Sequence, residues 1–138
     1  MARIPVRLTV ISILAFVLLI QSCPWTKLLT KNVEEVQKIT VINLRNGNRT
    51  SEITQEGNKD LINTIYQTIN TTKTRTVSEH EHQSVDPYFT ITLNYSDGTE
   101  EIIYSGESSN FISKELSGNG WIGGKNKVLI EVVNRLTI

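Results

Sequence analysis

Two histidines and three acidic residues in one polar segment are the side chains best suited to chemistry. They are Glu79, His80, Glu81, His82 and Asp86. Imidazole and carboxylate groups bind zinc or copper, and His80 and His82 would share one side of an extended strand. A structural zinc site needs a closed tetrahedral set, however, and the sequence holds 2 histidines in all. We interpret the segment as a solvated polar loop, with metal binding by His80, His82 and Asp86 as the alternative.

A glycine-rich segment, Gly118–Gly124, contains the pattern G-x-G-x-x-G. In dinucleotide-binding folds this turn belongs to a βαβ unit with an acidic residue about 20 positions further on. No second strand of such a unit is evident after the pattern, so we expect no cofactor. The segment is interpreted as a flexible turn that places Trp121 and Ile122 in the core. Two alternatives stay open: Trp121 as an exposed ligand platform, and an anion held by glycine amides and Lys125.

No arrangement of residues indicates catalysis. The sequence has no G-x-S-x-G pattern, and Cys23 is its single cysteine. Ser84 lies between His82 and Asp86, too close along the chain for a triad, whose members come from separate elements. Carboxylates are scattered singly, so no glycosidase pair can be named. We expect a protein that is not an enzyme.

Composition predicts a folded domain without a nucleic-acid partner. The chain is 38% hydrophobic and 20% charged, which is too apolar and too weakly charged for a disordered protein. Its 14 basic residues balance 14 acidic ones. A nearly neutral domain gives no electrostatic footprint for nucleic acid.

The first 23 residues predict export and anchoring. Arg3 and Arg7 precede an apolar run from residue 8 to residue 20, as in a secretory signal. The run ends in Ile-Gln-Ser-Cys at residues 20–23, which resembles a bacterial lipobox and makes Cys23 a candidate for lipidation. The alternatives are an uncleaved membrane span and a plain cleaved signal. The lipobox, the uncleaved span and the plain signal each predict that the remaining chain lies outside the cytoplasm. The lipobox and the uncleaved span also predict that this extracytoplasmic protein is anchored to the membrane.

The first half of the domain predicts a hairpin followed by a helix. Residues 38–44 and 49–54 have strand composition, and Asn46-Gly47 between them is the strongest signal for a type I′ turn. Apolar residues recur over 61–69 at the 3.6-residue period of a helix, with Asn58 as its N-cap. Residues 24–37 are interpreted as a tether.

The second half predicts further hairpins and a second helix. Residues 74–79 indicate a polar edge strand, and residues 88–95 alternate strictly, which exposes Thr90, Thr92 and Asn94 on one face. We expect return strands at 99–104 and 110–114, and an amphipathic helix at 126–136 with Val128 and Leu129 on its apolar side. The predicted fold is α+β: an antiparallel sheet of hairpins with two helices on one face, preceded by an N-terminal apolar helix. The domains are 1–23 (signal or anchor), 24–37 (tether) and 38–138 (α+β domain).

This layout resembles the small lipoproteins of Gram-positive bacteria that carry domains of unknown function. The residues behind the resemblance are 8–23, Asn46-Gly47, 61–69 and 89–104. The resemblance implies a cell-surface location and no specific activity. We expect a membrane-anchored binding module for a protein or cell-envelope partner, with Trp121, Lys125, Thr90, Thr92 and Asn94 as candidate contacts. The alternative is a metal-handling or enzymatic surface protein that uses residues 79–86.

Overall fold

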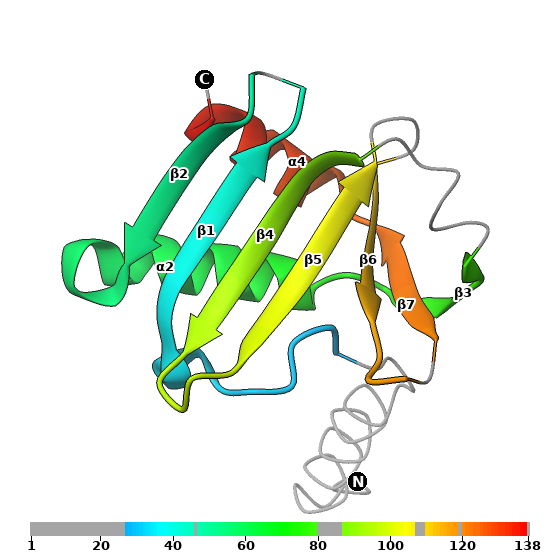
Figure 1. Cartoon of the computed structure of the whole chain (residues 1–138), viewed down its shortest axis with the longest axis horizontal. Helices are drawn as coiled ribbons and strands as arrows, with labels where there is room; N and C mark the ends of the chain where they lie inside the picture. Colours follow the sequence, from blue (N-terminus) through cyan, green and yellow to red (C-terminus); the bar gives the residue numbers. More distant parts are fainter. Residues whose placement is uncertain (1–26, 46, 80–86, 107–109, 119, 138) are drawn as a thin grey trace, which may run out of the picture.

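The computed structural model describes residues 27–45, 47–79, 87–106, 110–118 and 120–137 (Figure 1). The elements are the 3-10 helix η1 (Val33–Glu35), the strands β1 (Val36–Asn43), β2 (Arg49–Thr54), β3 (Arg75–Val77), β4 (Pro87–Tyr95), β5 (Glu100–Gly106), β6 (Phe111–Glu115) and β7 (Trp121–Lys125), and the helices α2 (Gln55–Asn70) and α4 (Lys127–Leu136). The N-terminal apolar helix that we predicted lies outside these residues. Within the part of the chain that is described, neither helix is long and apolar enough to cross a membrane.

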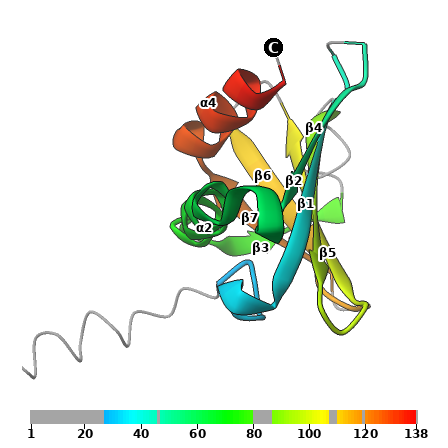
Figure 2. The same ribbon diagram turned by 90° about the vertical axis from the view of Figure 1, so that its left-hand side faces the viewer.

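The strands form one antiparallel sheet in the order β2-β1-β4-β5-β6-β7-β3. Figure 2 shows α2 and α4 together on one side of this sheet. The predicted α+β class, the antiparallel hairpins and the placement of both helices on one face are therefore confirmed. The predicted edge position of the strand near residue 75 is also confirmed, because β3 ends the sheet.

The core lies between the helices and the inner face of the sheet. Alternation along β4 buries Phe89, Ile91, Leu93 and Tyr95, whereas the residues between them are half-buried on the other face. Helix α2 contributes Ile62, Ile65, Tyr66 and Ile69, all within the apolar pattern predicted over residues 61–69. Helix α4 contributes Leu129, Ile130 and Val133. Val128 is 60% exposed, so its predicted place in the apolar stripe is wrong, and Ile130 packs inward instead.

Helix α2 has two successive caps at its start. Thr54 accepts a hydrogen bond from Gly57 N, and Asn58 accepts one from Leu61 N at 3.1 Å. Asn58 itself has non-helical angles (φ −156°, ψ 73°), so a short first turn meets the main helix at a kink. Asn58 therefore caps the main helix as predicted, and Thr54 adds a turn that the apolar pattern did not reveal.

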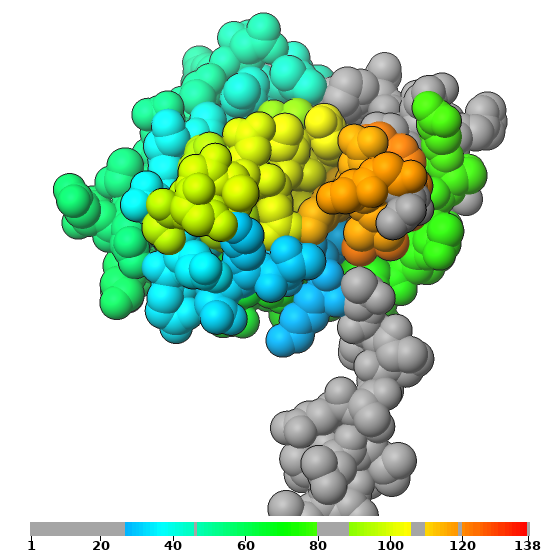
Figure 3. Space-filling view, turned by 60° about the horizontal axis from the view of Figure 1, so that its bottom comes forward, coloured from blue at the N-terminus to red at the C-terminus, as the bar shows by residue number. Residues whose placement is uncertain are grey.

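The predicted tether belongs to the domain from residue 27 onwards. Leu28 and Leu29 are buried in the main core, and Val36 begins β1. Figure 3 shows this first described stretch, in blue, lying against β5 in yellow and the β6–β7 hairpin in orange. The tether prediction is wrong for this stretch. The segment is short, and only its contacts with residues far along the chain reveal that one of its faces is buried.

The glycine-rich segment is also not a continuous loop. Gly118 and Gly120 have positive φ in the β6–β7 turn, but residues 121–125 form strand β7, paired with β6 and β3. A Cβ on Gly123 would lie 2.2 Å from Ile112 O, and one on Gly124 would lie 2.2 Å from Lys73 O. The two adjacent glycines therefore allow close backbone packing within the sheet. In the sequence, the same glycines have the composition of a loop.

The β1–β2 hairpin is confirmed with a longer connection than predicted. Asn43 pairs with Arg49, so the loop spans residues 44–48. Positive φ occurs at Gly47 and Asn48. The two-residue type I′ turn at Asn46-Gly47 is thus not the observed connection, and Asn46 lies outside the described residues.

Candidate functional site

The five predicted contact residues lie on one face of the sheet, opposite the helices. Paired residues of antiparallel strands share a face, and the register links Thr90 to Tyr104, Tyr104 to Ser113 and Ser113 to Gly123. Trp121 and Lys125 are two positions to either side of Gly123, so they share that face. Thr92 and Asn94 follow Thr90 along β4. We call this surface the open face.

An aromatic pair stands on the open face. The rings of Tyr104 and Trp121 meet edge to face, with centroids 5.8 Å apart and an interplanar angle of 70°. This geometry is a favourable one for two aromatic rings. The Arg75 guanidinium lies 5.3 Å from the centroid of the nearby Phe111 ring. The sequence predicted Trp121 as a contact and missed Tyr104, although strict alternation along the return strand of the hairpin could have placed Tyr104 on the same face as Thr90.

The degree of exposure differs among these residues. Lys125 is exposed, whereas Trp121, Thr90, Thr92 and Asn94 are half-buried. Asn94 donates a 3.4 Å hydrogen bond to Glu100 on the neighbouring strand. These residues of the open face thus present an aromatic pair, a row of hydroxyl and amide groups and the exposed ammonium of Lys125, all of which can contact a partner.

The predicted metal ligands and the lipidation residue are outside the described chain. His80, His82, Asp86 and Cys23 all fall in this category. Glu79, which comes directly before His80, is exposed. Among the residues that the structure does describe, no group of three or more potential metal ligands occurs.

A buried polar network on the inner face was not foreseen from the sequence. Lys114 of β6 forms an ion pair with Glu101 of β5, and the two side chains are 11% and 9% exposed. Tyr95 OH donates to Glu101 at 2.6 Å. Burial and the hydrogen bond to Glu101 raise the pKa of Tyr95 well above its ordinary value. Burial alone would raise the pKa of Glu101, but the hydrogen bonds from Lys114 and Tyr95 outweigh it and hold that pKa below its ordinary value.

The same network holds the first residues of the domain. Lys114 donates to Leu28 O at 2.6 Å, and the amide and hydroxyl of Thr30 both donate to Glu101 at 3.3 Å. Asn70 accepts from Leu29 N at 3.1 Å, and Tyr66 OH donates to Lys31 O. We call residues Leu28–Lys31 the strap. These side-chain contacts satisfy backbone groups that no strand or helix satisfies.

The strap covers one end of an incomplete strand pairing. Strands β5 and β6 pair at Tyr104–Ser113 and Ser105–Ile112, and Glu101 and Lys114 lie beyond those pairs. A pocket of about 390 Å³ opens there. Its lining includes Thr30, Lys31, Glu100, Tyr104 and Glu115 together with the ion pair. The ion pair therefore closes the gap between the two strands from within.

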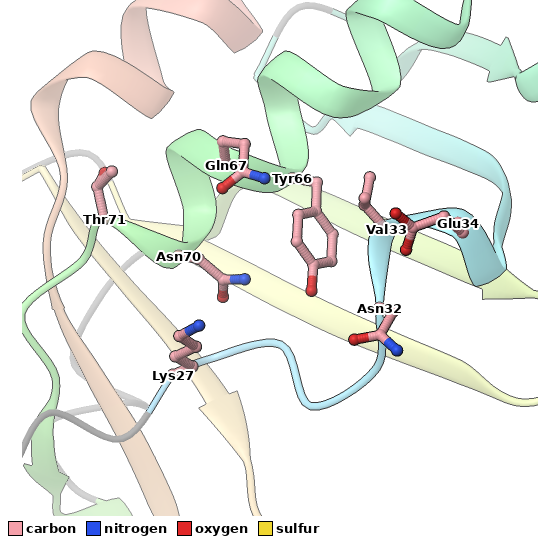
Figure 4. Close-up of a pocket in the computed structure, with 8 residues that line it drawn as sticks. All are labelled: Lys27, Asn32, Val33, Glu34, Tyr66, Gln67, Asn70 and Thr71. Atoms are coloured by element: carbon pink, nitrogen blue, oxygen red, sulfur yellow. The ribbon is translucent and has the colours of Figure 1, made fainter. Parts of the chain in front are cut away.

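A second pocket, of about 350 Å³, lies on the other side of the strap against helix α2 (Figure 4). We call it the Tyr66 pocket. It is lined by Lys27, Asn32, Val33, Glu34, Tyr66, Gln67, Asn70 and Thr71. Its volume falls at the lower end of the range for small-molecule sites, about 300–1,000 Å³.

The fold defines a small α+β domain: an antiparallel sheet, two helices on one face and a strapped N-terminal segment. Residues 26–118 match the family DUF5301, whose description reads "Domain of unknown function (DUF5300)". The chain therefore belongs to the DUF5301 family. No significant match was found among curated proteins or among solved structures. The family match supports one part of the resemblance noted above, namely a domain of unknown function. That the protein is a Gram-positive lipoprotein stays a prediction.

Proposed function

We propose that this DUF5301 protein is a non-enzymatic binding module, held at the outer face of a bacterial membrane through its first 23 residues. The basic and apolar pattern before Cys23 supports export and anchoring. Its partner is a protein or another component of the cell envelope. The proposal includes neither a bound metal nor a cofactor.

The domain would be held close to the membrane. The strap fixes the chain from Leu28 onwards, so residues 24–27 are the spacer between Cys23 and the domain. Four extended residues span at most about 14 Å. Such a short spacer restricts the partner to the space next to the membrane, in contrast to the longer reach of a 14-residue tether over residues 24–37.

The open face carries the binding proposal. Both helices cover the opposite face, and the register brings Trp121, Lys125, Thr90, Thr92 and Asn94 together on this one. Aromatic residues contribute a large contact area at low entropic cost and are enriched at interfaces. Threonine and asparagine side chains around them supply hydrogen bonds that fix a partner's orientation.

Cross-linking in intact cells tests the binding proposal. The full chain with Trp121→Ala should lose a specific cross-linked partner that the wild type captures. Val128→Ala is the matched control, because Val128 is exposed on α4, on the helical side of the molecule. Equal capture by wild type and Trp121→Ala would remove the open face as the binding surface.

Fatty-acid labelling tests the anchor separately. Metabolic label should enter the wild type and be absent from Cys23→Ala. An unlabelled wild type that still fractionates with membranes would replace lipidation with an uncleaved span. An unlabelled wild type that is released in soluble form would overturn anchoring.

A further inference from the structure

Two hydrogen bonds fix the floor of the Tyr66 pocket. Leu29 N donates to Asn70, and Tyr66 OH donates to Lys31 O. Tyr66 is 8% exposed, so its ring is held by packing on most sides. The two bonds link α2 to the strap and set the positions of Asn70 and Tyr66 before any ligand arrives.

The rim of the pocket carries exposed charged and polar groups. Lys27 and Glu34 are exposed and stand at opposite ends of the pocket, with Tyr66 between them (Figure 4). Neither forms an ion pair within the described chain. The Gln67 amide also lies on the rim (Figure 4). The pocket therefore offers one cation, one anion and an amide around an aromatic wall.

We propose that the Tyr66 pocket binds a short zwitterionic peptide, with its carboxylate at Lys27 and its ammonium at Glu34. The opposite charges at the two ends complement those of a free peptide, whereas a neutral sugar would leave both unpaired. Gln67 carries a carbonyl and an NH₂ group, which pair with the N–H and C=O groups of a peptide backbone. The volume of about 350 Å³ restricts the ligand to a short peptide. This site is separate from the open face and does not depend on the proposed function.

Nuclear magnetic resonance titration of the full chain in detergent micelles tests the proposal. The probe is trialanine, and the matched ligand control is trialanine with an acetylated amino group and an amidated carboxyl group. Trialanine should shift the amide resonances of residues 27–34 and 66–71. The blocked peptide should bind at least about fourfold more weakly, because it lacks both charges.

Charge-neutral variants locate the two ends of the ligand. Lys27→Gln and Glu34→Gln should each weaken trialanine binding about two- to fivefold, as expected for single exposed charge pairs. Lys127→Gln and Glu131→Gln are the matched controls, since both residues are exposed on α4. Trp121→Ala should leave trialanine affinity unchanged, so failure of the open-face proposal and failure of this one are distinguishable.

Three results would overturn the peptide site. The first is that trialanine causes no shifts up to millimolar concentration. The second is equal affinity for trialanine and its blocked form. The third is binding of N-acetylglucosamine at the same residues with no response to Lys27→Gln or Glu34→Gln, which would assign the pocket to a neutral sugar.

Discussion

Lys114 and Glu101 form an ion pair across a gap between two strands, and together they hold the backbone of a segment more than 70 residues away. The pair lies on the inner face of the sheet, where each side chain is about one-tenth exposed. Lys114 also donates to Leu28 O, and Glu101 accepts from Thr30. No buried side-chain nitrogen or oxygen of the described residues lacks a hydrogen-bond partner. A fully satisfied network of this kind specifies one arrangement of the strands and the strap.

Breaking this ion pair should destabilise the domain strongly. Lys114→Met leaves Glu101 buried without its cation, and we expect a loss of about 3–5 kcal/mol in the free energy of unfolding. Urea denaturation measures it. The control is Lys38→Met, because the Lys38–Glu52 pair at 3.9 Å is exposed and should be worth less than about 1 kcal/mol. A similar loss of unfolding free energy in both variants would mean that burial does not decide how much each ion pair contributes to stability.

Acid should weaken the domain through Glu101. Because the pKa of Glu101 is lower in the folded state than its ordinary 4.5, the unfolded chain binds more protons as the pH falls below that value. The stabilisation is therefore complete above pH 4.5 and is lost as the pH falls through the folded-state pKa. Glu101→Gln should show a shallower fall in unfolding free energy over this range than the wild type. Denaturation curves at a series of pH values check this, and parallel slopes for wild type and Glu101→Gln would contradict the assignment.

The strap should be required for stability. Leu28 is 0% exposed, and Leu28→Ala should cost about 2–5 kcal/mol through lost burial and a cavity. Leu44→Ala is the matched control, since Leu44 is 38% exposed in the β1–β2 loop and should change stability by less than about 0.5 kcal/mol. Thermal or urea unfolding gives the comparison. A mild effect of Leu28→Ala would return this segment to the role of a tether.

The adjacent glycines of β7 should not tolerate a side chain. Gly124→Ala places a Cβ 2.2 Å from Lys73 O, so the backbone of β7 or of the α2–β3 connection must move. We expect a loss above about 2 kcal/mol, which is in the range of steric strain in a core. Gly118→Ala has positive φ and no neighbour within 4 Å, so it should cost only about 1 kcal/mol. Equal losses in the two variants would show that conformational strain, and not close packing, sets the requirement.

Local patterns sufficed to predict both helices and every strand of the sheet except β7. The bounds of β2, Arg49–Thr54, agree with the predicted strand, and strict alternation placed Thr90, Thr92 and Asn94 correctly on one face. These elements are readable because their apolar residues repeat at the period of a strand or a helix. The predicted site residues on the open face follow from the same alternation once the register is known.

The strap and β7 were missed for a different reason. Leu28 and Leu29 sit in a segment too short to show a period, and their partners lie 41 to 86 residues further along the chain. The Lys114–Glu101 pair consists of two charged residues whose burial no local pattern indicates. Gly123 and Gly124 have the composition of a loop, and their role as strand residues depends on the approach of the Ile112 and Lys73 carbonyls.

The strap also determines how a mechanical force would enter the domain. Any tension applied through the residues before Lys27 reaches the folded part first at Leu28–Lys31, where polar side chains of β5, β6 and α2 grip the backbone. These contacts are few and lie outside the continuous ladder of the sheet, so they would yield before the strands separate. Detachment of the strap would uncover Leu28 and Leu29 and remove two partners from the Lys114–Glu101 pair. Pulling on the first described residues would therefore detach the strap while the strands of the sheet stay paired.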